Sequence, residues 1–196
     1  AGLSKFNYVN FSIRNYSIHE GLQSNEFNTN AYYKSRSGEI FFGGINGFNS
    51  FMPRKIIENK FVPPVVITNF YLFNENVAVG QKINGNTILQ KSPVQTDTII
   101  LDYDENIFSF EFAALDFTSS KYNIYKYMLE GFDEKWIDSG DRRIADYTNI
   151  DPGTYIFKVK GTNNDGVWNE KGDSITIIIN PPFWATWWFK LLGAVF

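Results

Sequence analysis

Ile107-Phe108-Ser109-Phe110-Glu111-Phe112-Ala113-Ala114 carries the clearest pattern in this sequence of 196 residues. Phenylalanine occupies every second position, with serine and glutamate between, so the segment has one apolar face and one polar face. A period of two is typical of a β-strand that buries one face. The segment therefore predicts a core strand in an all-β protein.

Downstream of residue 64 the sequence continues as a series of similar strands. The strands that we expect cover 65–73, 98–101, 107–114, 125–129, 155–159 and 174–179. About seven strands with no convincing helix are typical of an immunoglobulin-like or fibronectin-like β-sandwich, which we place at residues 65–181. Tyr155 closes an Asp-Pro-Gly-Thr-Tyr turn, which predicts that its hydroxyl bonds to upstream backbone.

Residues 1–53 contain an internal repeat. Gly2-Leu3-Ser4-Lys5-Phe6 recurs as Gly47-Phe48-Asn49-Ser50-Phe51, 45 positions later, and apolar groups lie between the two copies. Four short strands in about 45 residues match the size of one propeller blade. We therefore predict one four-stranded propeller-type blade, the last of a propeller whose other blades lie outside this sequence.

The segments that flank the predicted sandwich differ from it in composition. Residues 54–64 are expected to form a linker, which Pro63 and Pro64 stiffen. Residues 182–196 hold three tryptophans ahead of an apolar run, and Lys190 is their only charge. This pattern is typical of an aromatic belt that leads into a membrane helix. A span needs about 20 apolar residues, so we expect only the start of a transmembrane helix; a C-terminal core helix is the alternative.

Composition excludes several classes of chemistry. The sequence contains no Cys, which excludes disulfides, Cys-ligated zinc and a thiol nucleophile. His19 is the only histidine and lies in a predicted loop, so most His-dependent triads are excluded and we assign it no role. A net charge of −3 gives no excess of positive charge with which to bind nucleic acid. We predict no catalytic residue, no cofactor and no metal site.

Two groups of residues could still have carried chemistry. Acidic residues gather in predicted turns, where a structural role is favoured over a calcium site or catalysis; they are Asp102, Asp104 and Glu105, then Asp133 and Glu134, then Asp138 and Asp141. The aromatic residues, 18% of the chain, mostly fall on strand faces that suit a core. Trp136 and Trp168 lie beside loops and are the only candidates for stacking on a sugar.

Several segments, in their order along the chain, resemble one family. Residues 20–27 and 38–51 look like the regulator-propeller repeat. Residues 125–136, 147–155 and 163–168 resemble the YYY (Y_Y_Y) domain that follows such propellers, and Pro181-Pro182-Phe183-Trp184 is similar to that family's entrance to the membrane. The family is the hybrid two-component sensor of gut-type Bacteroidetes.

The resemblance implies a role for the segment. The chain would belong to the periplasmic region of an inner-membrane protein, acting as a homodimer attached to the membrane through a C-terminal helix. Propeller blades outside this sequence would sense a glycan, and a cytoplasmic histidine kinase would regulate polysaccharide-utilisation genes. This segment would transmit the signal without being an enzyme or binding nucleic acid. The residues alone leave an alternative, a secreted carbohydrate-binding or adhesion module, which needs exposed Trp136 and Trp168.

Overall fold

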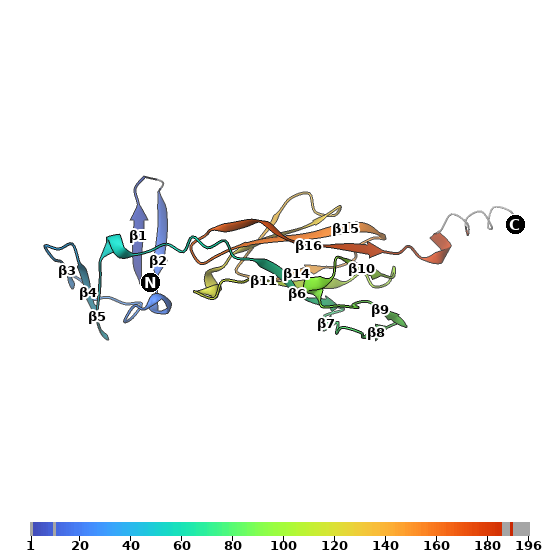
Figure 1. The fold of residues 1–196 in the computed structure, drawn as a ribbon, viewed down its shortest axis with the longest axis horizontal. Helices are drawn as coiled ribbons and strands as arrows, with labels where there is room; N and C mark the ends of the chain where they lie inside the picture. Colours follow the sequence, from blue (N-terminus) through green and yellow to red (C-terminus); the bar gives the residue numbers. More distant parts are fainter. Residues whose placement is uncertain (1, 10, 186–188, 190–196) are drawn as a thin grey trace. The chain divides into compact units, whose positions relative to one another are not determined.

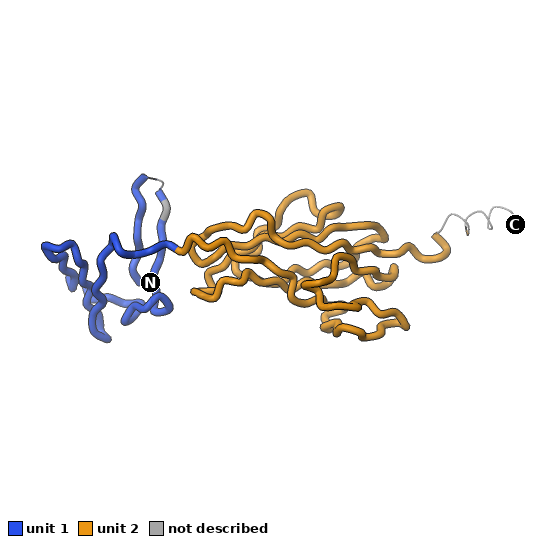
Figure 2. The backbone as a smooth tube through the Cα atoms, viewed as in Figure 1, with its two compact units in different colours: residues 1–58 blue, residues 59–196 orange. Residues whose placement is uncertain are grey.

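The computed structural model describes residues 2–9, 11–185 and 189, and its elements are strands and short 3-10 turns (Figure 1). The chain divides into two compact units, Ala1–Glu58 and Asn59–Phe196 (Figure 2). The boundary lies inside the segment 54–64, which was predicted to be a linker. The prediction of an all-β chain is confirmed.

The first unit contains two separate antiparallel sheets. Its elements are β1 (Leu3–Asn7), β2 (Ser12–Tyr16), η1 (Ile18–Glu20), β3 (Tyr32–Lys34), β4 (Ile40–Gly44), β5 (Gly47–Phe51) and η2 (Pro53–Lys55). Among the described residues of this unit, β1 pairs with β2 alone, and β3, β4 and β5 form the other sheet in that order. The prediction of one four-stranded blade is therefore wrong, because these strands form one sheet of two strands and another of three.

The 45-residue repeat explains this division. Gly2 and Gly47 open the two copies and have nearly the same left-handed backbone, with φ of 111° and 113°. Glycine adopts this conformation without steric cost. The repeat thus relates equivalent strands, β1 and β5, of two successive sheets, and the propeller itself stays a prediction.

The second unit is a β-sandwich. Its elements are β6 (Val65–Leu72), β7 (Glu75–Asn76), β8 (Lys82–Ile83), β9 (Asn86–Thr87), η3 (Pro93–Gln95), β10 (Thr98–Leu101), β11 (Phe108–Ala114), η4 (Ser120–Tyr122), β12 (Tyr125–Glu130), β13 (Ile137–Gly140), β14 (Ile144–Tyr147), β15 (Gly153–Thr162), β16 (Trp168–Ile179) and η5 (Phe183–Ala185). One sheet has the order β10-β16-β15-β12-β13 and the other β14-β11-β6-β7, with β8 and β9 as a separate hairpin. In the immunoglobulin fold, β12, β15 and β16 of the first sheet correspond to strands C, F and G, and β6, β11 and β14 of the second sheet correspond to strands A, B and E.

The predicted strands of this unit are confirmed, and five others were missed: the two-residue strands β7, β8 and β9, and the longer strands β13 and β14. β13 and β14 lie within residues 137–147, where the sequence predicted turns that contain acidic residues. Both are edge strands of only four residues, so each offers too few positions for an alternation to stand out, although Ala145 and Tyr147 of β14 are buried. Tyr155 donates a hydrogen bond from its hydroxyl to the carbonyl of Asp151 (3.0 Å), which confirms the predicted tyrosine corner.

The core of the sandwich is built from aromatic rings that the alternation of β11 directs inward. Phe108, Phe110 and Phe112 are fully buried. The ring of Phe110 stacks on that of Phe157 in the opposite sheet, with centroids 4.4 Å apart and an interplanar angle of 14°. This contact joins the two layers at the centre of the core.

The predicted membrane segment, 182–196, lies mostly outside the described residues. Among the residues that are described, no helix is both long enough and apolar enough to cross a bilayer.

The Phe110–Phe157 contact gives a stability prediction. We expect Phe110→Ala to lower the free energy of unfolding of the second unit by about 3–5 kcal/mol, because it leaves a cavity between the sheets. All five tryptophans lie in this unit, so tryptophan fluorescence during denaturation with guanidinium follows it alone. Phe117, whose side chain is 86% exposed, provides the control. Phe117→Ala should change stability by no more than about 0.5 kcal/mol, and equal losses in both variants would contradict the prediction.

Candidate functional site

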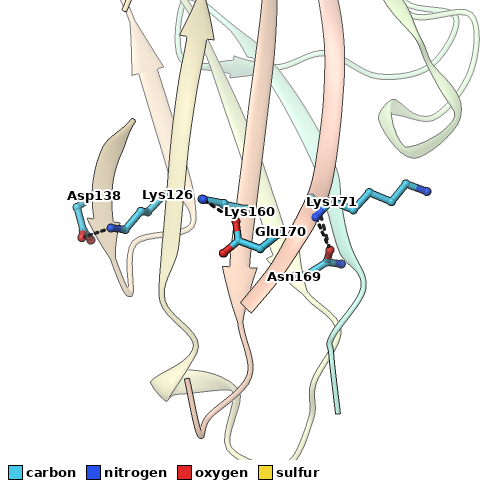
Figure 3. A network of polar contacts seen from close by, with 7 residues as sticks. Lys126, Asp138, Lys160, Asn169, Glu170 and Lys171 are labelled. Atoms are coloured by element: carbon cyan, nitrogen blue, oxygen red, sulfur yellow. Dashed lines mark hydrogen bonds and ion pairs between the residues drawn. The ribbon is translucent and has the colours of Figure 1, made fainter. Parts of the chain in front are cut away.

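Trp136 and Trp168 both lie beside Lys160 of the five-stranded sheet. Figure 3 shows the polar network beside them, in which Lys126 of β12 pairs with Asp138 of β13 (3.3 Å) and Lys160 of β15 with Glu170 of β16 (2.8 Å). The Nζ atom of Lys160 lies 4.8 Å from the ring centroid of Trp136 and 5.6 Å from that of Trp168. The two tryptophans are thus brought together around one lysine.

Cation–π contacts give both rings a structural role. Nζ of Lys126 also lies 5.7 Å from the ring centroid of Trp168, and each such contact contributes about 0.5–1 kcal/mol at an exposed site. Trp136 is 38% exposed and Trp168 is half-buried. Sugar binding by this pair stays a prediction.

Glu105 and Asp138, two of the acidic residues singled out in the sequence, accept hydrogen bonds from nearby backbone N–H groups. Glu105 is buried and accepts hydrogen bonds from the Asp102 backbone (2.9 Å) and from Asn84 (3.3 Å). The backbone N–H of Gly140, followed by the ammonium of Lys126, lowers the pKa of the Asp138 carboxyl below its usual value. Within the described part of the chain, no three His, Asp or Glu residues gather in a way that could hold a metal ion.

Asp133 connects a turn to the core through Tyr147. Its Oδ2 atom accepts from the backbone N–H of Leu129 (2.7 Å) and from the hydroxyl of Tyr147 (2.9 Å). Burial is the largest cause that raises the pKa of Tyr147 far above its ordinary value, and the bond to Asp133 adds to it. The phenol is therefore held protonated inside the sandwich.

A second polar network ties the linker to the sandwich. We call it the linker clasp, and it consists of Asn59, Asp116, Asn163, Asn164 and Asp165. The backbone N–H of Asn59 donates to Asp165, and its side-chain amide donates to Asp116 (2.8 Å) and Asn164 (3.0 Å). The first residue of the second unit is thus held by two separate loops of that unit.

Asn163 is the central residue of the linker clasp. Its amide nitrogen donates to the carbonyls of Asn59 (2.7 Å) and Phe61 (2.8 Å). Its amide oxygen accepts from the backbone N–H groups of Asp165 and Val167, both at 2.9 Å. The side chain is fully buried, so one residue satisfies four backbone groups. The sequence showed residues 163–166 only as a turn, because their partners in the linker lie more than 100 positions away.

β16 connects this clasp to the opposite end of the sandwich. Near its start, the amide of Asn169 donates to the carbonyl of Pro63 in the linker (2.9 Å). Beyond its end, the backbone N–H of Asn180 donates to the carbonyl of Leu101 (2.9 Å). The strand has 12 residues and so spans about 40 Å. A single hydrogen-bonded strand therefore runs from the linker end to the C-terminal end of the unit.

Three comparisons relate the chain to known proteins. Residues 116–180 match the model of the Y_Y_Y domain. The chain is 37% identical over 194 residues to Histidine kinase P4 of Formosa agariphila, a match that covers 99% of this chain and 14% of the relative. The chain thus spans about one-seventh of that relative's length.

Two solved structures of extracellular domains from two-component systems are also similar to this chain. The extracellular domain of the hybrid two-component system BT3049 from B. thetaiotaomicron is 28% identical, with a TM-score of 0.73, over 92% of this chain and 24% of that chain. The extracellular domain of the hybrid two-component system BT4673 from the same organism has a TM-score of 0.55 at 22% identity, over 93% of this chain and 23% of that one. The second match shows a shared fold.

The linker clasp gives a prediction on local stability. Asn163→Ala leaves buried backbone groups without partners, so we expect a loss of about 1–3 kcal/mol in unfolding free energy. The backbone amide of Asn59 should also exchange with solvent faster, since the linker loses its attachment. Asn76→Ala, on an exposed edge strand, is the matched control and should change neither quantity. Unchanged exchange at Asn59 in the Asn163 variant would show that the clasp does not hold the linker.

Tyr147 gives a prediction on alkaline stability. Above its ordinary pKa of about 10, the unfolded chain loses the phenolic proton while the folded chain keeps it. The unfolded state then binds fewer protons, so stability is complete below pH 10 and falls as the pH rises, by about 1.4 kcal/mol per pH unit for one such group. Denaturation of Tyr147→Phe between pH 9 and 11 should show a shallower fall than the parent chain. Parallel curves would contradict this account.

Proposed function

We propose that this chain passes a signal from an extracytoplasmic sensing region toward the membrane. Its Y_Y_Y domain and its homology to a histidine kinase confirm the predicted resemblance to the hybrid two-component sensors of Bacteroidetes. Its extracytoplasmic location is supported by the solved structures that it resembles, which are extracellular domains. The kinase activity is assigned to parts of the receptor outside this chain.

The observation that carries the proposal is the continuous path along β16. The linker is held at Asn59 by the clasp and at Pro63 by Asn169, while Asn180 is held against Leu101. A close-packed core passes on displacement because it cannot be compressed or sheared cheaply. Movement of the linker would therefore move the whole sandwich, including the point where the chain leaves it.

The finer parts of the proposal follow from the resemblance. The signal would be a glycan fragment bound by propeller blades outside this chain, and the output would be the regulation of polysaccharide utilisation. Two receptors would act as a homodimer, each attached to the inner membrane by a helix that follows residue 182. In this scheme Trp136 and Trp168 stabilise the sandwich and do not bind the sugar.

Rigid coupling is tested by an insertion in the full-length receptor. A flexible Gly-Ser segment placed after Asn180 should abolish ligand-induced transcription, because the sandwich could then move without moving the membrane segment. The same insertion after Gly85, in the exposed turn between β8 and β9, is the control and should leave induction intact. Ligand binding should be unchanged in both receptors. Full induction with the insertion after Asn180 would rule out rigid coupling.

A further inference from the structure

Aromatic side chains gather at the C-terminal end of the sandwich. The ring of Trp184 packs edge to face against that of Tyr103, with centroids 5.2 Å apart, and against that of Phe183 at 4.9 Å. Phe183 in turn contacts Phe189 at 5.5 Å. We call Tyr103, Phe183, Trp184 and Phe189 the C-terminal aromatic cluster.

The parallel pairing of β10 and β16 brings these residues together. Leu101 lies opposite Ile179, so both strands end at the same edge of the sheet. Tyr103 follows β10 by two residues, and Phe183 follows β16 by four. The cluster thus joins two loops that are about 80 residues apart in sequence, and Tyr103 belongs to the folded body of the sandwich.

The cluster is open to solvent, in contrast to the core. Tyr103 is 40% exposed, Trp184 46% and Phe183 58%, whereas the rings of Phe110 and Phe157 are fully buried. Contiguous exposed aromatic surface is a mark of an interaction site. Trp and Tyr, which pair an apolar ring with a polar group, are the residues that concentrate where a bilayer meets water.

The surrounding sequence identifies the partner. The eleven residues 186–196 that follow Ala185 contain one charged residue, Lys190, and this composition favours contact with lipid. Asp102 and Asp104 flank Tyr103, and their charges disfavour an anionic surface. A zwitterionic headgroup layer satisfies both conditions.

We propose that the C-terminal aromatic cluster lies in the zwitterionic headgroup layer of the membrane, so that the sandwich itself, through Tyr103, contacts the bilayer. The proposal rests on the membrane attachment in the proposed function and adds a second contact to it. Two contacts, one after β10 and one after β16, fix the angle at which the sandwich stands on the membrane. A covalent tether alone would leave this angle free.

The test uses the absence of cysteine from the chain. Asp104→Cys places a single fluorescent label beside Tyr103, before β11, and Phe117→Cys places one beyond the opposite end of that strand, which is itself about 23 Å long. The full chain is bound to phosphatidylcholine vesicles that contain a spin-labelled lipid as quencher. We expect loss of fluorescence for the label at 104 and none for the label at 117.

Two further arms make the test specific. Replacing Tyr103 and Trp184 by serine should remove the quenching at 104, while Phe132→Ser, an exposed aromatic outside the cluster, should leave it unchanged. Asp102 keeps its charge in the Asp104→Cys chain, so replacing part of the lipid by phosphatidylglycerol should weaken the quenching, and stronger quenching would overturn the zwitterionic assignment. If the chain binds vesicles but both labels stay unquenched, the cluster does not contact the bilayer, and the proposed membrane attachment still stands. A chain that stays in solution overturns the contact between the cluster and the bilayer, whereas the proposed attachment of the full-length receptor, which needs the rest of the membrane helix, stands.

Discussion

The stacking of Phe110 on Phe157 is the contact on which the second unit depends. It joins the centre of one sheet to the centre of the other at 4.4 Å, and Phe70 and Phe112 extend the aromatic layer on either side. Such rings bury a large area and pack with defined geometry. Because a shift of one residue would turn every ring of β11 toward solvent, the same contact also fixes the register of the strands.

Sequence periodicity predicted the parts of the fold that contribute to this core. The strands at 107–114 and 155–159 were found because burial of one face imposes an alternating pattern, and the strand at 65–73 was found from its nearly continuous run of β-forming residues. β13 and β14 were missed because they are edge strands of four residues each, and such strands tolerate exposed polar residues such as Asp138 and Asp146. In the first unit the repeat was recognised, but its period did not show which neighbouring strand each copy pairs with.

The candidate sites depended on contacts that sequence patterns do not encode. The hydrogen bonds from Asn163 to Asn59 and Phe61 join positions more than 100 residues apart. The contact between Tyr103 and Trp184 likewise requires the parallel pairing of β10 with β16. Trp136 and Trp168 were singled out as neighbours of loops, yet only the structure shows that Lys160 contacts both rings.

The position of β16 indicates where the coupling through this unit can be adjusted. The strand is hydrogen-bonded to β15 along most of its length and to β10 near its end, so sliding it would break many bonds at once. The ends are different: single side chains such as Asn163 and Asn169 hold the linker at one end, and the backbone hydrogen bond from Asn180 to Leu101 holds the chain at the other. The sandwich should therefore move as one body, and substitutions that tune signalling should concentrate at its two ends and leave the core unchanged.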